Sequence, residues 1–114
     1  MAKFYFTYGD DVHYPWQNGW TEVEAYDYQL AIRAFQMFHP NRPGSEALNC
    51  AGFYSESSWK ETIMARNNEN FGHGCRERIT VLVEPLSDVL SAKNNLACVE
   101  RRERITYQRE FLEG

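Results

Sequence analysis

Residues 3–25 read KFYFTYGDDVHYPWQNGWTEVEA, and this stretch decides the fold class. Aromatic residues alternate over positions 3–8, which is the period of a β-strand with rings on both faces. Positions 20–25 alternate apolar and polar residues in the same way. The glycines and aspartates between the two segments favour a loop over positions 9–19. The stretch therefore predicts two antiparallel strands that share one half-exposed face.

A helix is predicted directly after the second strand. Asp27 is a favourable N-cap, and Pro40 cannot continue a helix. Between them, five apolar residues recur at helical spacing: Leu30, Ala31, Ala34, Phe35 and Phe38. This spacing gives the helix one apolar face to pack against a sheet.

The middle of the chain predicts a short strand over 51–54 and a second helix, for which the segment from Ser55 to Ser58 offers several N-caps. Ser58 and Glu61 have the spacing of a capping box, in which each side chain bonds the other residue's backbone N–H. Residues 79–83 read ITVLV, which is typical of a central strand covered on both faces.

Beyond Pro85, a third helix is predicted from Leu86, Val89, Leu90 and Ala97. Residues 105–108 favour a strand, although their many charges also suit a solvated helix face. As a strand, the segment could add to the edge of the chain's own sheet or to that of a second copy, which would give a homodimer.

These elements predict an α+β fold, with a small, mostly antiparallel sheet of four to five strands and two to three helices packed on one face. A chain of 114 residues predicts a single domain over 1–114, with a core over 3–84 and a C-terminal extension over 85–114. Seven residues are expected to be mutually buried in its core: Phe35, Phe38, Trp59, Ile63, Ile79, Val81 and Val83.

Composition excludes several classes of protein. With 43% hydrophobic residues the chain can bury a core, which argues against disorder. Its formal charge is -4 with no basic cluster, which argues against direct nucleic-acid binding. No apolar run is long enough to span a membrane. Three cysteines without a CxxC pair, and no signal peptide, predict a soluble cytoplasmic protein with reduced thiols.

The best candidate site is a surface of aromatic and acidic residues in the first quarter of the chain. Trp and Tyr carry much of the energy of protein interfaces, and acidic neighbours suit a basic partner. The predicted partner-binding residues are Asp10, Asp11, Tyr14, Trp16, Trp20, Glu22 and Glu24.

Metal and catalytic sites are weaker candidates. Cys50, His73 and Cys75, with His39, could hold zinc, but they lack the close paired spacing of zinc sites. A nucleophilic pair of Cys50 with His39, or of Cys75 with His13, would need a spatial contact that spacing does not supply. Asp10, Asp11 and His13 could form a hard-metal site, but turn chemistry explains them equally. No cofactor and no catalytic residue are predicted.

Six short motifs resemble small uncharacterised proteins encoded by prophages and mobile elements of Gram-positive gut bacteria. The resemblance covers residues 3 to about 81 and is carried by the segments 5–9, 19–25, 38–41, 48–50, 54–56 and 70–75. This family has no assigned activity. The resemblance implies an accessory protein of the kind that inhibits host defence by binding, as anti-CRISPR proteins do.

The sequence therefore predicts a small non-enzymatic protein that binds and inhibits a host protein, such as a nucleic-acid-binding defence nuclease. Two alternatives stay open. One is a small enzyme with a Cys/His or Asp/His site, and the other is a self-assembling structural module.

Overall fold

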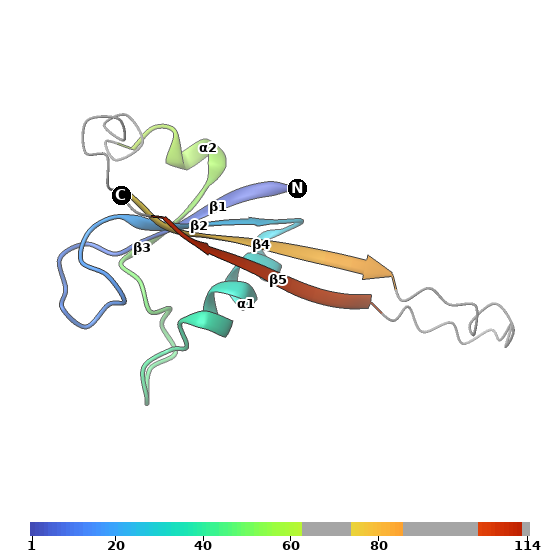
Figure 1. Ribbon diagram of the computed structural model, residues 1–114. Helices are drawn as coiled ribbons and strands as arrows, with labels where there is room; N and C mark the ends of the chain where they lie inside the picture. Colours follow the sequence, from blue (N-terminus) through green and yellow to red (C-terminus); the bar gives the residue numbers. More distant parts are fainter. Residues whose placement is uncertain (63–73, 86–102, 113–114) are drawn as a thin grey trace, which may run out of the picture.

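The computed structural model describes residues 1–62, 74–85 and 103–112 (Figure 1). Its elements are β1 (Ala2–Thr7), β2 (Trp20–Ala25), α1 (Tyr28–Phe38), β3 (Gly52–Ser55), α2 (Glu56–Trp59), β4 (Cys75–Pro85) and β5 (Glu103–Phe111). The predicted third helix lies outside the described residues.

The five strands form one mixed sheet in the order β3-β1-β2-β4-β5. Three of its four pairings are antiparallel, whereas β2 and β4 are parallel. The predicted α+β class with a mostly antiparallel sheet is confirmed. The predicted C-terminal strand is also confirmed, and it pairs with the chain's own β4 over its whole length.

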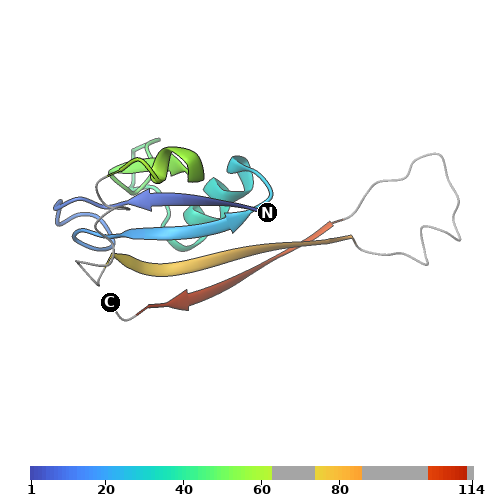
Figure 2. The same cartoon turned by 90° about the horizontal axis from the view of Figure 1, so that it is seen from above.

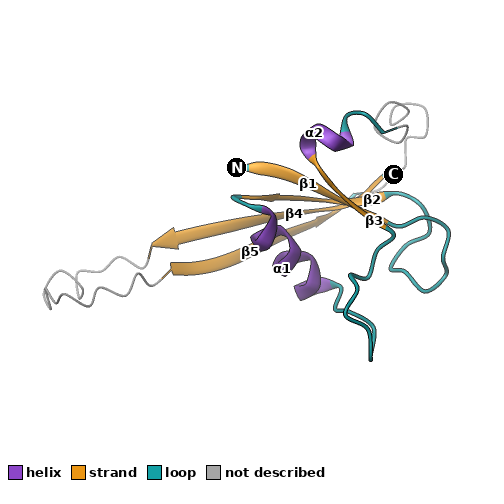
Figure 3. Cartoon of the chain, turned by 180° about the vertical axis from the view of Figure 1, so that it is seen from behind, coloured by secondary structure: helices purple, strands orange, loops and turns teal. Residues whose placement is uncertain are grey.

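The two helices lie on opposite faces of the sheet, which differs from the predicted arrangement on one face (Figures 1 and 3). The reason is the alternation of rings along β1. Phe4 and Phe6 point to the face that α1 covers, where they join the main hydrophobic cluster. Tyr5 points to the other face, where it forms a second cluster with Trp20 and with Trp59 of α2.

Phe35 of α1 is at the centre of the main cluster. It is fully buried, and its ring stacks on Phe6 with centroids 4.3 Å apart. Ile79 and Val81 are buried in the same cluster, as predicted.

Other predicted core residues have different positions. Phe38 and Val83 are partly buried against the main cluster. Trp59 does not join it, because its ring stacks on Tyr5 across the sheet from α1, with centroids 4.5 Å apart. Ile63 lies outside the described residues.

Local signals placed α1 correctly. The Asp27 carboxylate accepts a hydrogen bond from the backbone N–H of Leu30 at 2.8 Å, and the helix ends at Phe38, before His39 and Pro40. α2 is only one turn long. Its N-cap is Ser55, one of the predicted caps, which accepts from the backbone N–H of Ser58; the capping box of Ser58 with Glu61 is not the cap that the helix uses.

The central position of β2 was not predicted. Because β2 lies between β1 and β4, and α2 reaches over its second face, Trp20 and Glu22 are only 5% and 7% exposed. The predicted half-exposed face is therefore buried at these two residues. Figure 2 shows that the antiparallel pair of β4 and β5 extends past the ends of β1 and β2.

Candidate functional site

A glutamate on the core face of β4 organises the most unusual part of the molecule. β4 carries one extra residue beside β2, so that Trp20 is opposite Cys75 but Thr21 is opposite Glu77. Strand alternation sets Glu77 on the same face as Ile79 and Val81, whereas the β-bulge leaves Cys75 on the opposite face. The side chain of Glu77 is completely buried. A buried carboxylate is costly unless it is paired and hydrogen-bonded.

Glu77 meets that requirement with three partners from three other parts of the fold. Thr21 of β2 donates its hydroxyl to Oε1 at 2.8 Å, and Nε2 of His39 is hydrogen-bonded to the same oxygen. Arg109 of β5 donates its Nε–H to Oε2 at 2.7 Å. Since the Thr21 proton is used on Glu77, the Tyr8 hydroxyl donates to Thr21 Oγ1. We call these five residues the Glu77 network.

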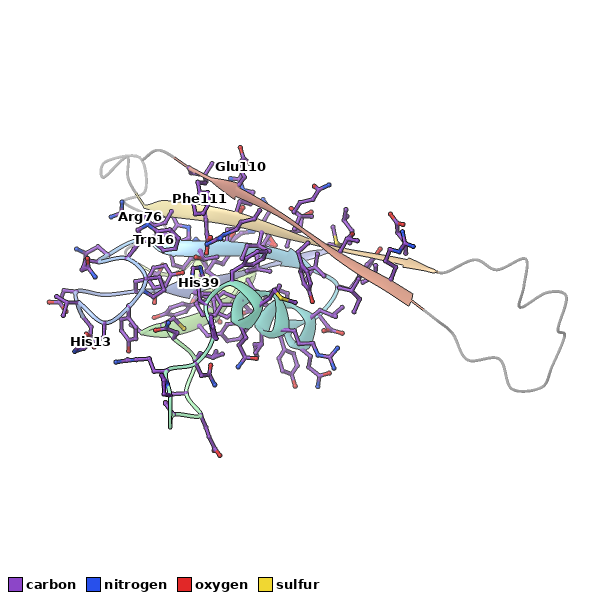
Figure 4. All side chains as sticks on the ribbon, turned by 60° about the horizontal axis from the view of Figure 1, so that its bottom comes forward. His13, Trp16, His39, Arg76, Glu110 and Phe111 are labelled. Carbon is purple, nitrogen blue, oxygen red and sulfur yellow. The ribbon has the colours of Figure 1, made fainter. Side chains whose placement is uncertain are left out.

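Aromatic rings cover the network. Trp16 of the 9–19 loop meets the ring of His39 edge-on at 5.4 Å, and it also contacts Tyr8 at 5.5 Å. Phe111 lies 6.3 Å from Trp16. The guanidinium of Arg109 lies over Phe111, 4.3 Å from the ring centroid. Figure 4 shows Trp16 between Phe111 and His39. Beneath this cover the side chain of Glu77 has no exposed surface and that of His39 is 8% exposed, whereas that of Arg109 is 27% exposed.

The electrostatics of the network favour the ionised carboxylate. Burial alone would raise the pKa of Glu77, but hydrogen bonds from His39, Arg109 and Thr21, together with the charge of His39, outweigh it and lower the pKa below its ordinary value of 4.5. Burial raises the pKa of Tyr8 well above its ordinary value, so its hydroxyl stays protonated.

The lowered pKa of Glu77 predicts a loss of stability in acid. A carboxyl whose pKa is lower in the folded state stabilises the fold above its unfolded pKa, and this stabilisation disappears as pH falls through the folded pKa. We expect the free energy of unfolding, measured by urea titration, to decrease as the pH is lowered below about 4.5. In a ¹³C NMR titration, the Glu77 carboxyl should titrate below 4.5. A midpoint at or above that value would contradict the assignment.

Chemically, the network is an anchor and not an open reaction centre. Both carboxylate oxygens of Glu77 already accept hydrogen bonds, and the side chain has no exposed surface that a substrate could reach. The network joins β2, β4, β5, the C-cap of α1 and Tyr8, which directly follows β1. It therefore fixes the helix and the last strand relative to the centre of the sheet.

The structure divides the predicted partner-binding residues between two places. Asp10, Asp11, Tyr14 and Trp16 lie in the 9–19 loop, on the side of α1. The other three lie on the opposite face of the sheet: Trp20, Glu22 and Glu24. Trp20 and Glu22 are buried and cannot form part of a contact surface as the molecule stands.

Glu22 takes part in a cluster of charged side chains on that face. Its carboxylate accepts from the Nε–H of Arg78 and lies 3.9 Å from Nζ of Lys3. Glu24 is opposite Lys3 in the register of β1 and β2. One continuous acidic and aromatic surface is therefore not formed.

The predicted metal and nucleophile residues are also dispersed. Cys50 packs against the main cluster and Cys75 against the second, so the two thiols lie on opposite faces of the sheet. His73 lies outside the described residues. Over residues 1–62, 74–85 and 103–112, no three His, Cys, Asp or Glu side chains are grouped to hold a metal ion.

The cysteines are poor nucleophiles in this setting. Burial raises the pKa of both Cys50 and Cys75 to about 11, so the reactive thiolate is rare at neutral pH. His39, the proposed partner of Cys50, is bound to Glu77. The Asp11 carboxylate accepts from the backbone N–H of His13 at 2.8 Å, which is turn chemistry and not metal chemistry.

Sequence reasoning missed the Glu77 network, although one signal for it was present. Glu77, Ile79, Val81 and Val83 share one face at the period of a strand. A charge at the start of a buried apolar row indicates a buried partner. The partner residues His39 and Arg109 could not be found in this way, because they are 38 and 32 residues distant.

Comparisons with protein-family models, curated protein sequences and solved structures find no match to this chain. The resemblance to proteins of prophages and mobile elements therefore stays a prediction. In the part of the chain that the structure describes, every helix is too short or too polar to cross a membrane.

Proposed function

We propose that this chain is a non-catalytic protein that acts by binding another protein. The observation that carries the proposal is that the side chains with reactive chemistry are engaged inside the fold. The buried carboxylate and imidazole of Glu77 and His39 are bonded to each other, and burial suppresses ionisation of the Cys50 and Cys75 thiols. Groups used in this way hold a fold together and leave recognition to the surface.

The contact surface that we propose combines the 9–19 loop with the end of β5, which meet where Trp16 lies 6.3 Å from Phe111. It consists of Asp10, Val12, His13, Trp16 and Phe111, and we call it the loop surface. Val12 is 76% exposed and Phe111 is 62% exposed, so both apolar side chains are available for contact with a partner. Trp16 is partly buried and supports this surface from beneath.

The backbone that carries the loop surface is well supported. The Tyr8 N–H donates to the Gly19 carbonyl at 3.1 Å, which closes the base of the loop. Arg76 of β4 donates to the carbonyls of Gln17 and Asn18 at 3.1 and 3.3 Å. A loop held in one conformation loses less entropy on binding, which favours a contact surface over a mobile linker.

For the partner we propose a host protein, and inhibition as the outcome, in the cytoplasm of the host cell. A defence nuclease with a basic nucleic-acid channel is the specific form of this proposal. It rests on the resemblance described above and on the formal charge of -4. The loop surface itself mixes signs, since Arg42 lies over Tyr14 at 5.1 Å and Arg76 binds the loop. Its apolar side chains are therefore the expected hot spots.

Matched surface variants test the loop surface. We expect Val12→Asp and Phe111→Asp each to abolish stoichiometric co-purification of a host protein, because a charge is introduced where apolar side chains are expected to be desolvated. Met37→Asp, at a residue of α1 that is 60% exposed, is the control and should retain the partner. Equal loss of the co-purified protein in all three variants, or no loss in the first two, would contradict the proposal.

A further inference from the structure

The last strand of the sheet has one open edge. β5 is the outermost strand, and among the described residues it pairs with β4 alone (Figure 2). An edge of nine residues offers a row of free N–H and C=O groups to another strand. The opposite edge strand, β3, has only four residues and continues directly into α2.

The side chains at the β5 edge are incompletely covered. Ile105 and Tyr107 point to the α1 face and are only partly buried against the main cluster. Tyr107 meets Phe38 edge-on at 6.2 Å, so α1 supports its ring. A further strand beside β5 would complete the burial of both residues.

We propose that β5 pairs with β5 of a second copy of this chain, antiparallel, with Thr106 on the two-fold axis. A two-fold interface must be self-complementary, and the sequence of β5 meets that condition in this register. Thr106 is opposite its own equivalent, Ile105 is opposite Tyr107, and Arg104 is opposite Gln108. Thr–Thr and aromatic–β-branched pairs are favourable across strands.

Charge is compatible with the same register. Charges on an edge strand usually prevent pairing when they repel a copy of themselves. In this register Arg104 is opposite the neutral Gln108, and no two like charges are set opposite each other between positions 104 and 108. Phe111 of the loop surface lies outside this stretch.

Analytical ultracentrifugation of the full chain tests the dimer. We expect the wild-type protein to sediment as a dimer at about 200 μM, a concentration that populates small interfaces. Thr106→Lys places two like charges directly opposite each other and should weaken the dimer about tenfold or more. Thr80→Lys adds the same charge on the same face of the sheet, but on the neighbouring strand β4, and should leave the dimer intact.

A wild-type monomer at that concentration overturns the inference, as does a Thr106→Lys protein that stays dimeric. Circular dichroism and thermal melting show whether Thr106→Lys is folded; a folded monomer is the expected result. The register has its own test in a background without native cysteines. Thr106→Cys should form a disulfide with its equivalent under mild oxidation, whereas Tyr107→Cys should not. The reverse result would overturn the register with Thr106 on the axis.

Discussion

Replacing Glu77 by Gln should cost about 3–5 kcal/mol of folding free energy, because removal of one partner leaves the other buried charges uncompensated. The amide keeps the shape of the side chain but is neutral, and its NH₂ group cannot accept a hydrogen bond. At least one of the donors from Thr21, His39 and Arg109 then has no acceptor. Urea denaturation followed by circular dichroism measures the change.

Glu84→Gln is the matched control. It makes the same chemical change on the same strand, but at an exposed residue, and should change stability by no more than about 0.5 kcal/mol. Equal effects of the two substitutions would show that the buried carboxylate does not anchor the fold.

The second large effect is expected at Phe35. Its ring is fully buried, stacks on Phe6 at 4.3 Å and contacts the ring of His39 at 5.1 Å. Phe35→Ala should cost about 3–5 kcal/mol from lost burial and the cavity left behind. Small domains are stable by only about 5–15 kcal/mol, so the variant should be close to unfolding.

Met37→Ala is the control for Phe35, because Met37 lies on the same helix with its side chain 60% exposed. Its melting temperature should stay near that of the wild-type protein. If Phe35→Ala also melts like the wild type, α1 does not pack on the sheet through the face described here.

Elements with local signals could be predicted from the sequence. α1 has an N-cap, an apolar stripe and a terminating proline within a few residues of one another, and Asp27 and Phe38 are its limits in the structure. The alternation along β1 and β2 likewise assigned Val23 and Glu22 to opposite faces. Such patterns are set by the periods of helix and strand, which do not depend on the rest of the chain.

The tertiary environment of these elements could not be predicted. Trp20 and Glu22 were expected at the surface, because alternation shows which residues share a face but not what covers it. Trp59 of α2 packs on Trp20, and Arg78 of the parallel neighbour β4 pairs with Glu22; both come from distant sequence. The face of Glu77 follows from its alternation with Ile79 and Val81, but its partners His39 and Arg109 come from distant sequence. Residues 74–78 carry no recognisable signal for the bulge beside β2.

The wide spacing of the Glu77 partners has a consequence for biosynthesis. His39 is translated 38 residues before Glu77, whereas Arg109 follows it by 32 residues. A nascent chain can thus pack α1 on β1 and β2 early, but it carries a carboxylate with an incomplete set of donors until β5 has left the ribosome. Contacts between distant segments form slowly, and partly folded chains expose apolar surface. We expect stalled or prematurely terminated chains that lack Arg109 to be poorly packed, and hence substrates for chaperones and proteases.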